Sequence, residues 1–333
     1  MRYDVEIPTC REGIFTPVDF ATPAEVTGCI QLAERLGYET VWATDFIAPC
    51  PSSGVSDEQR PNWYEPMIAL AHAAGVTSRI RLGTGVVMMP YRDTVMLAKQ
   101  AATLDQFSGG RFVLGMGLGA YKDEFNMVRP RDKKVHRGRL LDDQLEAIIP
   151  LLGASDSPVS YAGEYVEVDG LRLNPKSVQQ PLPIYVPCRN DAMIERAAKW
   201  RLGAMFSAND ATAQLQKLNE ALERHGGSPG DVDVIGEGEL RIAPTHEEAV
   251  TAYKASHMGQ YRTKVAPARS RVDLDPIIAK NWIGTVDDVV EKISRAKEAG
   301  LNHVNALHIA GDTMEERLEQ MHLFAEEVMP KVG

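Results

Sequence analysis

The apolar run from Ile80 to Met88 shows no alternation with polar positions. This pattern is typical of a parallel strand that is covered on both faces. From Asp93 onward, apolar residues recur at helical spacing until the chain reaches Gly109 and Gly110. These features predict a helix that Asp93 caps and the two glycines end. A second strand is expected from Arg111 to Gly117, so the segment as a whole predicts one βαβ unit.

The same alternation of strand and helix patterns continues to the end of the chain. Strands are expected at Tyr3–Ile7, Thr40–Thr44, Arg81–Met88, Phe112–Gly117, Pro183–Pro187, Gly203–Ser207, Glu239–Ala243 and His303–Leu307. Amphipathic helices are expected at Ala24–Leu36, Met67–Ala74, Asp93–Phe107, Arg137–Leu152, Asp191–Trp200, Ala211–Arg224, His246–His257, Val286–Ala299 and Met314–Val328. Eight such units predict an α/β fold of the (β/α)8 TIM-barrel type.

Two stretches interrupt this alternation, and neither has the features of a domain boundary. Residues 153–182 contain the sequence VSYAGEYVEV, which predicts a small hairpin that turns near Ala162 and Gly163. Residues 258–281 show weak periodicity, and a long irregular loop of this kind is often a lid. We therefore expect one domain over residues 1–333, with an insertion before the fifth strand and a lid loop.

Three glycines, Gly115, Gly117 and Gly119, follow one another at alternate positions at the end of the fourth strand. A dinucleotide fingerprint would need a tight turn straight into a helix and a further strand that ends in an acid. The next predicted element, from His136 to Leu152, is instead another helix, which disfavours that interpretation. A purely structural role remains open, because glycines also relieve crowding where strands converge.

Composition and charge narrow the range of possible functions. The chain has 333 residues, is 44% hydrophobic and carries a formal charge of −10. An acidic chain without a concentrated basic surface disfavours nucleic acid and anionic membranes as partners. No apolar run approaches the roughly 20 residues of a membrane span, and the N-terminus lacks the pattern of a signal peptide. These features favour a small-molecule enzyme of the cytoplasm.

Cysteine and histidine give no metal-site pattern. Cys10, Cys29, Cys50 and Cys188 are scattered, without the paired spacing of a zinc site or a disulfide framework. His303 and His308 are five apart on one predicted strand and should therefore face opposite sides of it. No metal is expected.

Five sequence blocks carry a resemblance to a known family. They are the segment of residues 79–125, GYETVWATDF at 37–46, HRGRLLDDQLEAIIPLL at 136–152, NPKSVQQPLPIYV at 174–186 and NWIGTVDDVVEKI at 281–293. Each block is weak alone, but together they occur in family order over nearly the whole chain. The chain resembles the bacterial luciferase-like superfamily of flavin- and F420-dependent oxidoreductases.

This resemblance implies a barrel enzyme, commonly a homodimer, whose cofactor ring lies at the C-terminal mouth of the barrel. The cofactor is expected to be reduced FMN or, alternatively, F420. The ends of the third and fourth strands would then form the walls of the ring site. The residues expected there are Thr84, Gly85, Val86, Gly117, Gly119 and Tyr121.

The chain departs from the family pattern in two places. The loop after the fifth strand carries a glycine pair and a serine in many members, but here it contains Arg189, Asn190 and Asp191. Arg189 and Asn190 are therefore the candidates for binding the cofactor phosphate, with Arg189 as an anion clamp. Many members also carry an Asp-His pair after the second strand, whereas this chain has Asp45 and Phe46. Asp45 is either a catalytic base or a carboxylate anchored by local backbone amides.

The substrate pocket is predicted less directly, from large side chains near strand ends. The candidates are Trp42, Phe46, Trp63, Met88, Tyr91 and Trp282. An aromatic-lined pocket would suit a small, fairly apolar organic substrate. We therefore expect a reduced-FMN monooxygenase that uses molecular oxygen, with a separate flavin reductase as a candidate partner. F420-dependent hydride transfer and a non-catalytic flavin- or ligand-binding relative are the alternatives.

Overall fold

The computed structural model of the chain describes residues 1–9, 21–53, 63–208, 211–265 and 271–332, and it shows a closed parallel barrel. The order around the barrel is β1-β2-β3-β5-β8-β9-β10-β12, and β12 pairs with β1 to close it. Its strands are β1 (Arg2–Glu6), β2 (Thr40–Ala43), β3 (Arg81–Thr84), β5 (Phe112–Gly117), β8 (Ile184–Pro187), β9 (Gly203–Ser207), β10 (Val234–Ile242) and β12 (His303–Ile309). The predicted (β/α)8 TIM barrel is confirmed.

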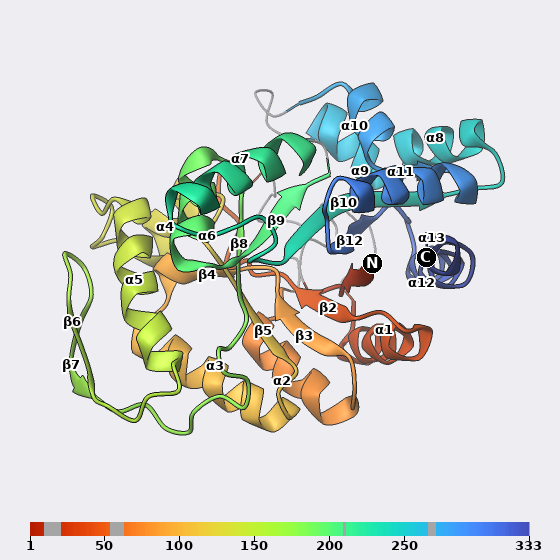
Figure 1. Cartoon of the computed structure of the whole chain (residues 1–333). Coiled ribbons are helices and arrows are strands. Elements are labelled where there is room, and N and C mark those ends of the chain that lie inside the picture. Colours follow the sequence, from red (N-terminus) through yellow and green to blue (C-terminus); the bar gives the residue numbers. More distant parts are fainter. Residues whose placement is uncertain (10–20, 54–62, 209–210, 266–270, 333) are drawn as a thin grey trace.

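Helices cover the outside of the barrel, as Figure 1 shows. They are α1 (Pro23–Leu36), α2 (Pro66–Val76), α3 (Thr94–Ser108), α4 (Lys122–Val128), α5 (Arg137–Leu152), α6 (Asp191–Trp200), α7 (Ala211–Arg224), α8 (His246–Ala255), α9 (His257–Gln260), α10 (Leu274–Lys280), α11 (Val286–Glu298), α12 (Met314–Leu323) and α13 (Met329–Val332). Asp93 caps α3 by accepting a hydrogen bond from the Met96 amide, and Gly109 ends this helix in a left-handed conformation, as predicted.

The structure differs from the sequence-based prediction around β10. This strand begins at Val234, whereas the predicted start was Glu239. The sequence-based prediction missed the first half of the strand because Gly236, Glu237 and Gly238 lack a strand-like apolar pattern. The strand predicted over Arg81–Met88 is divided into β3 and the short β4 (Val87–Met88). The strand β11 (Trp282–Gly284) and the short helix α4 were not predicted. Residues 258–281 are helical over much of their described part rather than an irregular loop.

A β-bulge in β12 corrects the expectation for its two histidines. The register between β10 and β12 shifts after the pair Gly238 and Ala306, so one extra residue of β12 interrupts the alternation of faces. His303 lies against Asp4, and His308 lies against Glu6, with nitrogen–oxygen distances of 3.1 and 3.2 Å. Because Asp4 and Glu6 are two apart on β1, both histidines lie on the same face of the sheet.

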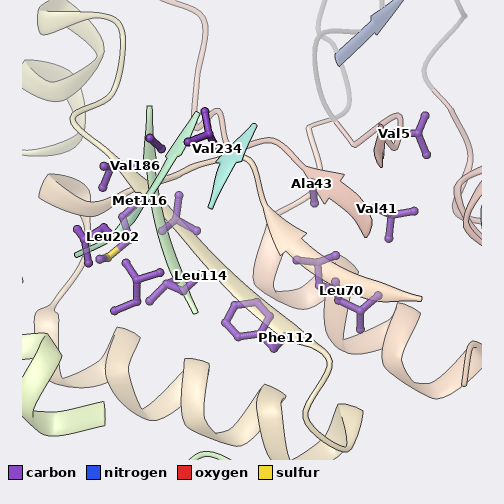
Figure 2. Packing of buried hydrophobic residues seen from close by; sticks show 14 of the residues in the cluster. Val5, Val41, Ala43, Leu70, Phe112, Leu114, Met116, Val186, Leu202 and Val234 are labelled. Carbon is purple, nitrogen blue, oxygen red and sulfur yellow. The ribbon is translucent and has the colours of Figure 1, made fainter. Parts of the chain in front are cut away.

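The hydrophobic core has two layers in the barrel, and a separate cluster lies among α8, α9, α10 and β11. The larger one lies between the strands and the surrounding helices, and Figure 2 shows Phe112 and Leu114 of β5 within it. The smaller one fills the barrel interior and includes Trp42 and Tyr185, whose rings meet edge to face at 5.9 Å. The interior layer closes the barrel below its mouth, so a ligand can enter only above it.

The predicted hairpin is present within residues 153–182. It consists of β6 (Val159–Ala162) and β7 (Glu167–Leu171), which pair antiparallel. Figure 1 shows this hairpin beside α5 at the edge of the molecule. It lies away from the barrel mouth and does not contribute to the cavity described below.

Candidate functional site

A cavity of about 460 Å³ lies at the C-terminal ends of the barrel strands. This volume falls in the range of small-molecule pockets, about 300–1,000 Å³. The lining residues come from the segments that follow β2, β3, β5 and β8 and from β10. They are Thr44, Asp45, Phe46, Ser53, Gly85, Val86, Met88, Gly117, Leu118, Gly119, Ala120, Tyr121, Glu124, Pro187, Arg189, Asn190, Met193 and Glu237.

Backbone without side chains forms two walls of this cavity. Gly85 lies on one wall, where it is joined to Val86 by a cis peptide bond. Gly117 lies on another, and a Cβ there would come within 2.8 Å of the Val86 side chain. Gly119 adopts a φ of +77°, a left-handed conformation that favours glycine. These walls leave room for a flat ligand to lie close to the main chain.

Thr84, which was predicted for the ring site, and Gly115 of the glycine-rich segment have mainly structural contacts. The Thr84 hydroxyl donates to the Gly115 carbonyl and accepts from the Gly115 amide, at 2.8 and 2.9 Å. Thr84 is fully buried and does not line the cavity. A Cβ at Gly115 would lie 1.9 Å from the Thr84 carbonyl oxygen. Gly115 therefore relieves crowding between β3 and β5, whereas Gly117 and Gly119 line the cavity.

Asp45 lies on the cavity wall with its carboxylate held by two groups. It accepts a hydrogen bond from the Met88 amide at 2.8 Å and forms an ion pair with Arg92. Arg92 also pairs with Glu65 at 2.9 Å. The Asp45 side chain is only 1% exposed, and that of Arg92 is 14% exposed. These contacts tie the end of β2 to the segment that follows β3 and favour the anchoring role for Asp45.

Glu124, at the start of α4, is a cavity residue that the sequence-based reasoning did not identify. Its Oε1 accepts hydrogen bonds from the amides of Ile47 and Ala48 at 2.9 and 3.4 Å, and its Oε2 accepts from the Tyr91 hydroxyl at 3.2 Å. Burial raises the pKa of the Glu124 carboxyl, although these three donors act in the opposite direction. An acidic residue in a segment for which no helix or strand was predicted gives no sign that it is buried.

The segment after β8 provides the cationic group of the cavity. Arg189 is nearly half exposed and forms an ion pair of 2.6 Å with Glu237, which is buried on β10. Asn190 caps α6 by accepting from the Met193 amide at 3.0 Å. Asp191, the next residue, pairs with Lys217. A bound anion would meet Arg189 and also the carboxylate that Arg189 neutralises.

A second, more polar cavity of about 430 Å³ shares Ala120 and Tyr121 with the first. Arg137 lines it and donates to the carbonyl oxygens of Leu118, Gly119 and Tyr121 at 3.1 to 3.3 Å. Arg137 therefore fixes the backbone of the glycine-rich segment after β5 while its charge remains at the edge of the second cavity.

The residues predicted for the substrate pocket lie in different places. Phe46 and Met88 line the cavity, and Trp63 packs against Phe46 with ring centroids 4.1 Å apart. Tyr91 contacts the cavity through Glu124. Trp42 and Trp282 lie in the core instead, because each ring fills the space beside a glycine of a neighbouring strand. The indoles would be 2.3 Å from a Cβ at Gly83 and 2.8 Å from one at Gly238, respectively.

Within the described ranges, no helix is long and apolar enough to cross a membrane. Over the same residues, no group of three or more His, Cys, Asp or Glu side chains is placed to hold a metal ion.

Comparison with known proteins gives consistent matches. The family model described as luciferase-like monooxygenase matches residues 7–303. The 4-hydroxyprotoasukamycin monooxygenase of Streptomyces nodosus subsp. asukaensis is 27% identical over 91% of this chain and 85% of its own. The F420-dependent glucose-6-phosphate dehydrogenase of Amycolatopsis mediterranei is 28% identical over 90% of this chain and 92% of its own. The coenzyme F420-dependent tetrahydromethanopterin reductase structure from Methanopyrus kandleri covers 100% of this chain and 99% of its own, with a TM-score of 0.77 and 22% identity.

Proposed function

We propose a function for this chain from the premise that it belongs to the luciferase-like monooxygenase family, whose model matches residues 7–303. It is therefore an oxidoreductase of a family whose members use reduced FMN or F420. Our proposal is that this chain binds F420 and transfers a hydride between this cofactor and a small polar organic molecule.

The observation that carries this choice is the set of carboxyl groups on the cavity wall. Asp45, Glu124 and Glu237 all line the cavity, while two of the expected aromatic residues, Trp42 and Trp282, lie in the core. Hydride transfer to a carbonyl or imine carbon is accompanied by proton transfer to its heteroatom, which an acidic group can supply. Oxygen activation by a reduced flavin instead depends on excluding water, which a wall with several carboxyl groups does not favour.

The residues present fit a flat cofactor with an anionic tail. The main chain at Gly85 and Gly117 lines the cavity, and Gly117 lets Val86 and Pro187 pack close to the end of β5, because a Cβ there would lie 2.8 Å from Val86 and 3.2 Å from Pro187. Arg189 would meet the phosphate, with Arg137 at the edge of the second cavity as a further cation. Bound F420 supplies a hydride from its reduced ring.

The chain's own residues have separate roles in this proposal. Asp45 and Arg92 hold Met88 and the end of β2 in place, which fixes the wall opposite the glycine-rich segment. Phe46, backed by Trp63, gives the substrate an apolar surface. Glu237 partly neutralises the charge of Arg189 through their ion pair. This end of the cavity therefore favours a ligand with one anionic group over a ligand with several.

The reduced-FMN monooxygenase expected from the sequence is the second candidate. It is favoured by the apolar part of the wall, which Phe46, Val86, Met88 and Leu118 form. In that case the chain would insert one oxygen atom from molecular oxygen into a small apolar substrate and would take reduced FMN from a separate reductase. Thr84, which is hydrogen-bonded to Gly115, would act in either case by fixing the strand ends.

Titrating the purified protein with F420 and, under anaerobic conditions, with reduced FMN tests the proposal. We expect F420 to bind with at least tenfold higher affinity and Arg189→Ala to weaken its binding more at low than at high salt. Arg224→Ala, which removes an exposed cation of α7, is the matched control and should leave binding unchanged. Tighter binding of reduced FMN would favour the monooxygenase, and binding of neither would favour a non-catalytic relative.

We also propose that the chain forms a homodimer. Helices α2 and α3 pack against each other and expose Ile68, Met96 and Phe107, which are 70%, 56% and 82% exposed. Large apolar side chains exposed on two neighbouring helices suit an interaction surface. Sedimentation of the wild type and of Phe107→Lys would test this, with a monomeric wild type contradicting it.

A further inference from the structure

We infer that Glu124 is the group that exchanges a proton with the substrate and that Tyr91 positions its carboxyl group. This inference rests on the proposed hydride transfer. It names a proton donor in a chain that has Phe46 where many relatives have a histidine.

The position of Glu124 is the first argument. Its side chain is buried, yet it lines the cavity. Two backbone amides occupy its Oε1, whereas its described partner at Oε2 is the Tyr91 hydroxyl. A carboxyl group held this way has one oxygen fixed by the main chain and the other available for proton exchange.

The Tyr91 hydroxyl is the second argument, because it has two acceptors at the same distance. It lies 3.2 Å from Glu124 Oε2 and 3.2 Å from the carbonyl oxygen of Tyr121. When Glu124 is ionised, the hydroxyl donates to the carboxylate. When Glu124 is protonated, the hydroxyl donates to the carbonyl and its own oxygen accepts from the carboxyl group. Tyr91 therefore gives Glu124 a hydrogen-bonding partner in both protonation states.

The surroundings of Glu124 favour the protonated form of its carboxyl group. Burial raises its pKa, and the nearby Asp45 acts in the same direction. The other ionisable groups around it are Cys50, Asp123 and Arg137. Arg137 lies on the Phe125 ring and is hydrogen-bonded to main-chain carbonyls. A carboxyl group whose pKa lies above its usual range is better suited to general acid catalysis near neutral pH.

The proton balance of the step is as follows. The substrate carbon accepts the hydride, and its oxygen or nitrogen takes the proton from Glu124 Oε2. The cofactor is oxidised by two electrons, and the substrate is reduced by two. The carboxylate that remains accepts hydrogen bonds from Ile47, Ala48 and Tyr91 and then regains a proton from water.

Infrared titration of the cofactor-free protein tests this directly through the carboxyl C=O stretch. We expect the wild type to show a protonated carboxyl band that persists above the ordinary Glu range and is absent in Glu124→Gln. In Tyr91→Phe the band should persist to higher pH, because the carboxylate loses a donor. F420 should shift the band in the wild type. A Glu124 band with an ordinary titration, or one that is unaffected by bound F420, would overturn the inference.

Kinetics with reduced F420 and cyclohexenone as the acceptor provide a second readout. Glu124→Gln keeps an oxygen for the Ile47 and Ala48 amides, so it should fold and bind F420, but kcat should fall about 100-fold with KM little changed. Its loss of activity at high pH should disappear, and that of Tyr91→Phe should move to higher pH. A Glu124→Gln profile identical to the wild type would contradict the inference. Failure of F420 to bind would contradict the proposed function instead, and the infrared titration would still decide the protonation of Glu124.

Glu34→Gln is the matched control. Glu34 also clamps backbone amides, those of Ser78, Arg79 and Ile80 at 2.6 to 3.1 Å, but it lies on α1 and outside the cavity. Its substitution removes a carboxylate clamp of the same kind without changing the group that faces the ligand. We expect this variant to keep both the infrared band and the pH profile of the wild type.

Discussion

Replacing Arg92 with methionine tests whether Asp45 is a structural anchor of the cavity wall. The substitution keeps most of the side-chain volume but removes the cation that neutralises Asp45. The Asp45 side chain is 1% exposed and that of Arg92 is 14% exposed, so the pair is largely shielded from water. Asp45 would then retain the Met88 amide as its described donor. Removing one partner of a buried ion pair costs about 3–5 kcal/mol, because the other charge stays buried without compensation.

This cost can be converted into a change in melting temperature. At about 2.1 cal/mol/K per residue, the 333-residue chain has an unfolding entropy of about 0.7 kcal/mol/K. The expected loss therefore lowers Tm by roughly 4–7 °C. Differential scanning calorimetry at fixed protein concentration and neutral pH would measure it. The double variant Asp45→Asn with Arg92→Met should lose less than Arg92→Met alone, because no buried charge remains.

Arg295→Met is the matched control for this prediction. Arg295 forms an ion pair with Glu291 in which both side chains are more than half exposed. Such surface pairs contribute at most about 1 kcal/mol, so Tm should fall by less than about 2 °C. If Arg92→Met destabilised the protein no more than Arg295→Met, the assignment of Asp45 as an anchor would be wrong.

Two further predictions concern the cavity wall and the base of the barrel. Gly117→Ala places a methyl group 2.8 Å from Val86 and should weaken F420 binding at least tenfold. Gly28→Ala is the control and should leave binding unchanged, because a Cβ there meets nothing within 4 Å. Equal affinities of the two variants would show that the ring lies elsewhere. His303 and Arg2 hold the pKa of Asp233 below its usual range, so the stability that Asp233 provides is present above about pH 4 and is lost as the pH falls further. Burial opposes the charge of His303, but Asp233 and Asp4 outweigh it and raise its pKa, so its contribution is present below about pH 6.5 and is lost as the pH rises through the raised value. Asp233→Asn should therefore lower Tm at pH 5 more than at pH 3, and an equal loss at both would refute this.

The sequence predicted the barrel well where apolar residues mark both faces of a strand. β5 and α5 begin and end at the predicted residues, because their apolar patterns are strong and glycines flank them. The start of β10 was missed because one face of its first half carries Glu237 and the other carries Gly236 and Gly238, so neither face has a continuous apolar pattern. The face of His308 could not be predicted, because the bulge that sets it depends on pairing with β10.

The cavity was predicted in part, because the local sequence marks its glycines but not a residue whose burial depends on a distant segment. Glycines at the ends of β3 and β5 mark bare backbone, and Gly85, Gly117 and Gly119 line the cavity. Glu124 was missed because its burial depends on the segment at Ile47 and Ala48, which lies far away in sequence. Trp42 was misplaced because residues near a strand end can point down into the barrel as well as toward its mouth.

Competitive binding of the two cofactors tests the central claim most directly. Purified protein would be dialysed to equilibrium under anaerobic conditions against equal concentrations of F420 and reduced FMN, and the bound fraction of each would be measured. The account predicts that F420 occupies the protein in at least tenfold excess and that Gly117→Ala releases it. Preferential retention of reduced FMN would contradict the proposed hydride transfer from F420.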